Sequence, residues 1–207
     1  DGIGLTLTKR LLDLGWKVHG LSKSQSPVAA DSYQHTVVDV VSDEFPAVIA
    51  EASRDGLQLC VYCPGIGDAL DWDNLAAERL VFEVNLMGAV KTIEAVLPIM
   101  LTNSGGQIVI LSSLADEILS PEAPSYSASK AALSSYVESL ALAVKPKGVA
   151  ITNVRFGFVD TKMAKGDRKP FMMTVDRAVD HLIRCTEKRP IRFSRPLTMA
   201  ALVRVAR

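Results

Sequence analysis

The sequence lacks the cysteine patterns of secreted and zinc-binding proteins. Its three cysteines, Cys60, Cys63 and Cys185, are an odd number and form no disulfide framework. Cys60 and Cys63 make one C-x-x-C pair, but no second ligand pair accompanies it, so no metal site is predicted. This cysteine usage is typical of the cytosol, and we expect a cytoplasmic protein.

Charge of one sign and long hydrophobic runs are also missing. The 23 basic and 23 acidic side chains cancel, which argues against nucleic acid or an anionic membrane as a partner. No signal peptide is recognisable, and no uninterrupted run of about eighteen apolar residues occurs, so we expect no stable membrane insertion. A helix expected around 196–207 is amphipathic and basic, which is typical of a capping helix or a subunit contact; a membrane surface is the alternative. These absences leave a small or neutral molecule as the favoured partner.

What is present is a substantial core in a single domain. The 207 residues are 48% hydrophobic, and no repeat or linker divides them. Short β-branched runs alternate with segments of helical periodicity, which predicts an α/β fold: a doubly wound parallel sheet of Rossmann type over residues 1–207. Strands are expected at 17–21, 35–40, 57–62, 107–111, 150–155 and 191–193, and helices at 3–14, 43–54, 74–101 and 125–144.

The two longest predicted helices are apolar around much of their circumference. A helix that covers a sheet needs only one apolar stripe, so 74–101 and 125–144 have a second face to bury. We expect that face at a subunit contact, which gives a homodimer or a homotetramer. The start of the chain is unusual as well, because Asp1-Gly2-Ile3-Gly4 opens a helix with no strand before it. We therefore expect the N-terminal strand and the first part of the glycine-rich loop to be missing from this chain.

Three motifs carry chemistry. Gly2 and Gly4 at a helix start would let backbone amides approach a pyrophosphate, although two such glycines are often only a tight turn. Tyr126 and Lys130 lie one helical turn apart on the same face, where the ammonium would stabilise a phenolate; an exposed tyrosine beside a lysine is the alternative. Ser113 precedes Tyr126 at the carboxyl end of a predicted strand, where open α/β sheets bind ligands.

In their order and spacing, these motifs resemble the classical short-chain dehydrogenase/reductase family over nearly the whole chain. The matching segments are Gly2-Ile3-Gly4 with the end of its Thr-Gly-x-x-x-Gly-x-Gly loop, Asn85 with its helix asparagine, Ser112-Ser113 with its strand-end serines, Tyr126 and Lys130 with its Tyr-x-x-x-Lys, and Phe156 to Thr161 with its Pro-Gly-x-x-x-Thr. Two positions depart from the pattern. Cys63 replaces the asparagine of the family's Asn-Ala-Gly, and Phe156 replaces the proline before Gly157.

The resemblance implies a role for each matching residue. Tyr126 would protonate a carbonyl oxygen or deprotonate an alcohol, and Ser113 would hydrogen-bond the same oxygen. Lys130 would lower the pKa of Tyr126 and bind the nicotinamide ribose, while Asn85, through its main-chain carbonyl and a water, would pass protons to Lys130. Ser112 and Tyr136 are expected to be structural. The implied cofactor-binding residues, besides Tyr126 and Lys130, are Gly2, Ile3, Gly4, Asp39, Val40, Gly65, Gly157, Val159 and Thr161.

The choice of cofactor depends on the end of the second strand of the family fold. NAD enzymes usually place an acidic residue there, whereas this sequence has Ser22 followed by Lys23. A serine hydroxyl and a lysine ammonium would bind a 2′-phosphate, so NADP(H) is favoured and NAD(H) is possible. The alternative is that these residues form only a polar loop.

The substrate is expected to be small and apolar, with a carbonyl or a primary or secondary alcohol. A substrate loop around 157–173 and the segment after Ser113 would supply the apolar residues Leu114, Ile118, Leu119, Met163, Phe171, Met172 and Met173, unless several of them only pack the lid. The sequence thus predicts an NADP(H)-dependent oxidoreductase. A non-catalytic NAD(P)-binding sensor or scaffold is the main alternative, and a sugar-nucleotide epimerase is a third.

Overall fold

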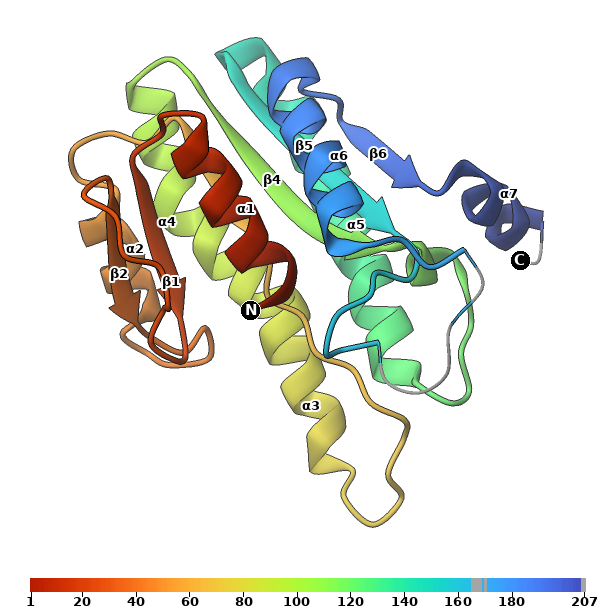
Figure 1. Cartoon of the computed structure of the whole chain (residues 1–207). Helices are drawn as coiled ribbons and strands as arrows, with labels where there is room; N and C mark the ends of the chain where they lie inside the picture. The colour runs from red at the N-terminus through yellow and green to blue at the C-terminus, as the bar shows by residue number, and fades with distance from the viewer. Residues whose placement is uncertain (165–168, 170, 206–207) are drawn as a thin grey trace.

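The computed structural model describes residues 1–164, 169 and 171–205. Helices and strands alternate along most of the chain, as the apolar patterns predict, although β1 is followed directly by β2 (Figure 1). The strands are β1 (Val18–Ser22), β2 (Tyr33–Val37), β3 (Leu59–Tyr62), β4 (Gly106–Ser113), β5 (Val149–Phe156) and β6 (Arg192–Arg195). The helices are α1 (Gly2–Asp13), α2 (Phe45–Ala52), α3 (Ala76–Phe82), α4 (Gly88–Thr102), α5 (Pro124–Val144), α6 (Val175–Lys188) and α7 (Leu197–Val205), with π-helical η1 (Glu83–Met87) and the 3-10 turns η2 (Leu114–Glu117) and η3 (Lys145–Lys147).

Every paired strand in these six is parallel to its neighbour. One sheet has the order β3-β4-β5-β6, and β1 and β2 form a second sheet of two strands. Parallel strands place their carboxyl ends at the same edge, so Tyr62, Ser113 and Phe156 all end at one edge of the larger sheet. The arrangement confirms the predicted α/β fold of Rossmann type.

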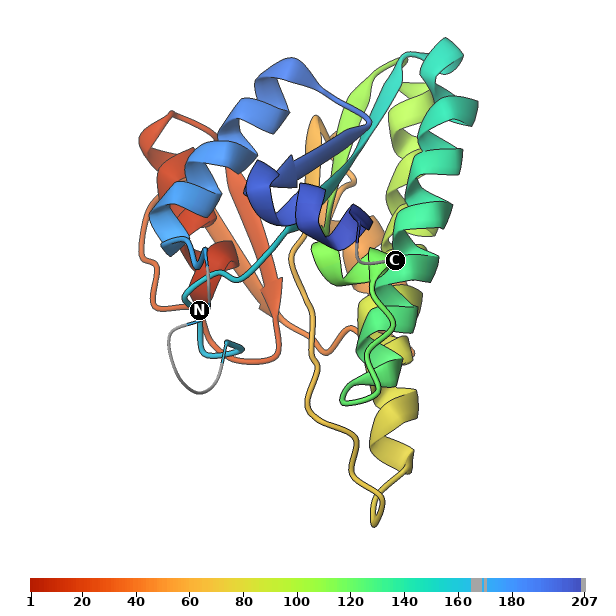
Figure 2. The ribbon, with the colours of Figure 1, turned by 90° about the vertical axis from the view of Figure 1, so that its right-hand side faces the viewer.

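Helices cover both faces of the sheets, which Figure 2 shows edge on. Along β4 the side chains alternate, and Ile108 and Ile110 join a buried cluster with α2, α4 and α5, whereas Val109 and Leu111 join a cluster with α1 and α6. Both faces of this strand are buried, which explains its nearly continuous apolar sequence.

The same two clusters hold the two sheets together. Leu21 of β1 packs against the cluster that contains Tyr62 of β3, and Val18 and Val61 both pack against the other cluster. The division falls between β1 and β3, the place where the expected N-terminal strand would pair; that strand stays a prediction.

Several elements differ from expectation. The long helix predicted over 74–101 is α3, η1 and α4, because the π-helical η1 interrupts it. The helical run Ala76–Thr102 is long and apolar enough to cross a membrane, but length and composition alone are weak evidence for a membrane span. Ile93 and Met100 of this run pack into the core. Helix α6 was not predicted. Most residues of α6 are polar, and its buried residues form one stripe along the helix. The Thr174 hydroxyl caps the start of α6 by accepting a hydrogen bond from the N–H of Arg177.

Candidate active site

Four predicted catalytic residues converge at the carboxyl edge of the larger sheet. Ser113 is the last residue of β4, Tyr126 and Lys130 lie in the first turns of α5, and Asn85 is the central residue of η1. The Ser113 side chain is near enough to the Tyr126 phenol to lower its pKa, and the Lys130 ammonium lies 5.9 Å from the centre of the Tyr126 ring. The structure therefore brings the predicted acid/base pair and its two partners into one site.

The Tyr126 ring packs against the backbone of the loop that follows β3. A Cβ atom on Gly67 would lie only 2.5 Å from Cδ2 of Tyr126, so a side chain at this position would displace the ring. Only glycine leaves room for the ring in this orientation. This role was not predicted, because Gly67 is not part of a recognised motif.

The surroundings of Tyr126 do not lower its pKa in the cofactor-free chain. Burial raises the pKa, the hydrogen bond from Ser113 lowers it, and the negative charge of Asp116 raises it again. The net effect is a raised pKa. The effect of Lys130 on this pKa stays a prediction, because the causes of the shift are burial, Ser113 and Asp116.

Lys130 is buried with little to compensate its charge. Its side chain reaches the carboxyl end of β4, where Nζ donates a hydrogen bond to the main-chain oxygen of Leu111 over 3.1 Å. Burial lowers the pKa of Lys130 to about 8, although the negative charge of Asp116 acts in the opposite direction. Among the residues that the structure describes, no carboxylate forms an ion pair with this ammonium. Lys130 can therefore change its protonation state near neutral pH.

Asn85 clamps the loop after β3 onto the site. Its fully buried amide accepts a hydrogen bond from the N–H of Ile66 over 2.8 Å, and donates to the main-chain oxygen of Ile66 and to the Ser129 hydroxyl. An ideal Cβ on Gly65 would lie 3.5 Å from Lys130 Nζ and 3.7 Å from Asn85 Oδ1, so the loop backbone runs close to both. A π-helical turn at this point is a common feature of functional sites.

The mouth of α1 meets the segment after β5. Gly2 has a φ of +53°, which glycine adopts without strain, and a Cβ there would lie 3.4 Å from Cγ2 of Thr161. No side chain caps the first N–H groups of α1, so those of Gly2, Ile3 and Gly4 point out of the positive end of a 12-residue helix. These groups and Thr161 fit a pyrophosphate. Cys63 packs beside Gly4, with 3.6 Å between its Cβ and an ideal Cβ on Gly4.

At the end of β1, the residues predicted to bind a 2′-phosphate already have partners. The Ser22 hydroxyl contacts the main-chain oxygen of Ser24 and lies 2.9 Å from Nε2 of His35, and Lys23 Nζ lies 2.9 Å from Oδ2 of Asp39. Burial tends to raise the pKa of Asp39, but the hydrogen bond and charge of Lys23 hold it below its usual value. An exposed pair of this kind stabilises by about 1 kcal/mol or less, so Lys23 remains available to an anion.

Two further residues in this region have partners in the structure. Val40 packs against the core beside Gly88, where its Cβ lies 3.4 Å from an ideal Cβ on Gly88, and its contact with the cofactor stays a prediction. His35 was not predicted to take part, because its contact with Ser22 depends on the register of β1 and β2.

The predicted substrate residues divide into exposed and buried ones. Ile118, Met163 and Phe171 are 38%, 40% and 53% exposed and are open to a ligand, as is Leu119. Leu114, in contrast, is fully buried beside Gly157, which favours its alternative role in packing.

The backbone of the predicted substrate loop is partly fixed. Met173 is buried, and its N–H and C=O pair with Phe158 and Asp160, while Gly157 donates to Arg195 of β6. Val159 forms a parallel bridge with Met173. Residues 165–168 and 170 of the loop lie outside the described residues.

Comparison with known proteins gives one consistent result. The family model described as short chain dehydrogenase matches residues 1–170. A protein of Myxococcus xanthus described as an uncharacterized oxidoreductase is 32% identical over 83% of this chain and 69% of its own length. The very-long-chain 3-oxoacyl-CoA reductase of Anas platyrhynchos is 28% identical over 83% of this chain, which spans 61% of that reductase.

Solved structures show the same fold. A short chain dehydrogenase from Burkholderia cenocepacia, solved in complex with NADP, superposes with a TM-score of 0.87 at 23% identity, covering 98% of this chain and 87% of that one. A short-chain dehydrogenase from Streptomyces avermitilis gives a TM-score of 0.84 at 21% identity, covering 99% and 89%.

The buried Lys130 ammonium predicts a pH dependence of stability. Its pKa is about 8 in the folded chain and about 10.4 when unfolded, so between these values the unfolded state binds the extra proton. Stability should then rise with pH across this window, by up to about 3 kcal/mol relative to Lys130→Met. Urea unfolding of both proteins from pH 7 to 11 measures the difference. A difference that is flat, or that falls with pH, would contradict the burial of a charged Lys130.

Proposed function

Because the chain belongs to the short-chain dehydrogenase family, and is therefore an oxidoreductase with a nucleotide-binding fold, we propose that it is an NADP(H)-dependent enzyme that interconverts a carbonyl and an alcohol. Tyr126 is its acid/base. The observation that carries this proposal is the convergence of Tyr126 with Ser113, Lys130 and Asn85 at the sheet edge where such folds bind ligands. A purely binding or sensing protein has no need for an acid/base pair of phenol and ammonium in one site.

The proposed chemistry divides among these four residues. When bound, NADPH supplies the hydride that the carbonyl carbon accepts. The Tyr126 hydroxyl gives its proton to the carbonyl oxygen, and the Ser113 hydroxyl holds that oxygen by a hydrogen bond. Lys130, when protonated, stabilises the phenolate that Tyr126 becomes, and Asn85 keeps the loop of Gly65 against the ammonium. In the reverse direction Tyr126 takes the proton of the alcohol.

The proposed cofactor is NADP(H), with NAD(H) as the alternative. Its pyrophosphate would lie at the mouth of α1, its 2′-phosphate at Ser22 and Lys23, and its nicotinamide near Gly157, Val159 and Thr161. The free N–H groups of α1 support the first placement, and the exposed Lys23 ammonium supports the second.

The proposed substrate is a small molecule with an apolar body next to its carbonyl or alcohol. The exposed apolar side chains of Ile118, Met163 and Phe171 support an apolar body, as does the similarity to a protein named very-long-chain 3-oxoacyl-CoA reductase. We also propose a cytoplasmic location, because Cys60, Cys63 and Cys185 are all free thiols.

We propose a homodimer or homotetramer built on α4 and α5. Met87, Tyr136 and Leu142 are 39%, 37% and 64% exposed on the outer faces of the α3–α4 run and α5. Leu142→Glu should shift the protein to a smaller species in sedimentation velocity, because a charge would be buried at the contact. Leu197→Glu on α7, where the leucine is 63% exposed, is the matched control and should leave the size unchanged. Equal sedimentation of the two variants, or a monomeric parent protein, would remove α5 as the interface.

Tyr126→Phe tests the acid/base. It removes only the hydroxyl, so turnover of apolar carbonyls should fall by about 10²–10⁴, whereas NADPH affinity, measured by fluorescence titration, should change little. Tyr136→Phe, on the same helix but outside the site, should retain activity. Undiminished turnover in Tyr126→Phe would show that another group moves the proton. A parent protein that binds NADPH but reduces no carbonyl would instead favour the sensor.

Lys23→Glu tests the choice of cofactor. Replacing the ammonium with a carboxylate repels a 2′-phosphate, so NADPH binding should weaken by tens-fold while NADH binding changes much less. Lys17→Glu makes the same charge change at the opposite end of β1, where Lys17 is exposed, and should affect neither cofactor. Equal losses for NADPH and NADH in Lys23→Glu would reject the 2′-phosphate assignment.

A further inference from the structure

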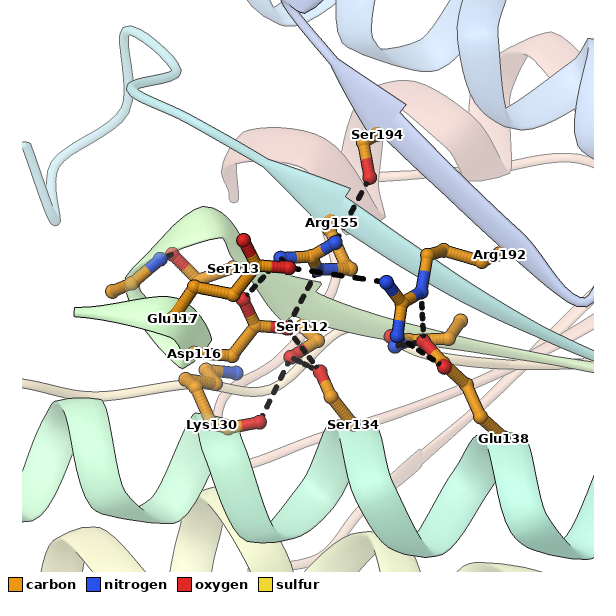
Figure 3. A network of polar contacts seen from close by, with 12 residues as sticks. Ser112, Ser113, Asp116, Glu117, Lys130, Ser134, Glu138, Arg155, Arg192 and Ser194 are labelled. Carbon is orange, nitrogen blue, oxygen red and sulfur yellow. Dashed lines mark hydrogen bonds and ion pairs between the residues drawn. The ribbon is translucent and has the colours of Figure 1, made fainter. Parts of the chain in front are cut away.

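A buried ion pair lies directly behind the site, between η2 and β5 (Figure 3). The Arg155 guanidinium donates from Nη2 to Oδ1 of Asp116 over 2.5 Å and from Nε to Oδ2 over 2.6 Å, and Nη2 also lies 2.6 Å from Glu117. The Arg155 and Asp116 side chains are 4% and 3% exposed. Solvent therefore screens this pair weakly.

Hydrogen bonds connect the pair to the residues of the site. The Ser134 hydroxyl donates to Oδ2 of Asp116 over 2.6 Å. Because a hydroxyl has only one proton to donate, Ser112 is the donor in the 2.8 Å contact between the Ser112 and Ser134 hydroxyls. Ser112 Oγ also lies 3.3 Å from the main-chain oxygen of Lys130. Asp116 belongs to the turn η2, which begins after Ser113. The Ser113 hydroxyl caps this turn by accepting a hydrogen bond from the N–H of Ala115.

Charge makes Asp116 significant for the chemistry. An ionised carboxylate near a phenol opposes the loss of its proton, and Asp116 acts on Tyr126 in this sense. The Arg155 guanidinium cancels much of that charge at contact distance. The ionisable groups facing Asp116 from the elements around it are Tyr126 and Lys130 of α5, Arg155 of β5, Glu117 of η2 and Arg192 of β6, with Arg204 of α7 lining the hollow beside Glu117.

We propose that Asp116 and Arg155 form a charge-compensated pair that fixes the Ser113 turn and sets the electrostatic potential at Tyr126 and Lys130. Both are positioning residues, since they act through the site and not on the substrate. Stability alone does not explain such a pair, because a buried ion pair often stabilises a protein no more than apolar residues of the same volume. The inference rests on the proposed role of Tyr126 as acid/base, but the measurement below requires no turnover.

The test is a titration of Tyr126 in the cofactor-free protein labelled with ¹³C at tyrosine Cζ. The Tyr126 resonance is assigned by its loss in Tyr126→Phe. Asp116→Asn removes the negative charge and should raise the tyrosinate-to-tyrosine ratio at fixed pH by about threefold or more. Arg155→Gln uncovers that charge and should lower the ratio. The double variant should lie between the two and close to the parent protein.

Arg155→Lys separates charge from geometry. It keeps the cation but loses the two-point contact, so the Tyr126 titration should stay near that of the parent protein even if stability falls. Shifts of the same sign in Asp116→Asn and Arg155→Gln, or no shift in Asp116→Asn, would overturn the proposal. If circular dichroism shows that Arg155→Gln does not fold, Asp116→Asn and Arg155→Lys decide. If the Tyr126 titration shifts in opposite directions in Asp116→Asn and Arg155→Gln but the parent protein has no turnover, the proposed pair stands and the proposed function is rejected. If Tyr126→Phe abolishes turnover but the two variants show no opposite shifts, the proposed function stands and the pair is rejected.

Discussion

The burial of the Lys130 ammonium is the constraint around which the rest of the site is arranged. Moving a charged group out of water costs several kcal/mol unless polar groups replace the lost hydration. Here the replacement comes from the end of a strand, where the main-chain oxygen of Leu111 accepts from Nζ. A lysine placed one turn later on α5 would miss this oxygen. The position of Lys130 relative to β4 thus fixes the position of Tyr126, one turn earlier on the same helix face.

A second consequence concerns the loop after β3, which must pass close to the ammonium and the phenol. Gly65 and Gly67 allow this approach, since a Cβ on either would come near Lys130 Nζ or overlap the Tyr126 ring. A glycine loop is inherently mobile, so its position needs a clamp. Asn85 provides one from η1 with two hydrogen bonds to Ile66, which also explains why the asparagine lies where the helix is locally widened. Segments far apart in the sequence are held around one charge.

How far the sequence predicted this site depends on how local each signal is. Tyr126 and Lys130 are four residues apart on one helix, and Ser113 ends an apolar strand, so periodicity and spacing find them. Asp116 and Arg155 are separated by 39 residues, and only the parallel pairing of β4 and β5 brings them together. The raised pKa of Tyr126 is equally non-local, because it depends on burial.

The elements were predicted better than their ends and interruptions. The strands of the larger sheet were found, and β4 among them is buried on both faces, whereas α6 was missed because its polar residues outnumber its buried stripe. Leu114 was assigned to the substrate because it follows Ser113, but η2 turns its side chain into the core. Hydrophobicity alone does not distinguish a residue that lines a site from one that supports it.

The two ends of the proposed cofactor site differ in how strongly the fold fixes them. Around Lys130 the groups are buried, and any displacement disrupts several hydrogen bonds at once. At Ser22 and Lys23 the groups are exposed, and Asp39 holds the Lys23 ammonium. A 2′-phosphate would have to compete with that carboxylate, but an exposed pair contributes about 1 kcal/mol or less, whereas a charge-assisted phosphate contact contributes about 1.5–3 kcal/mol. Asp39 therefore costs little affinity, and it restricts the lysine to the end of β1 before the cofactor arrives.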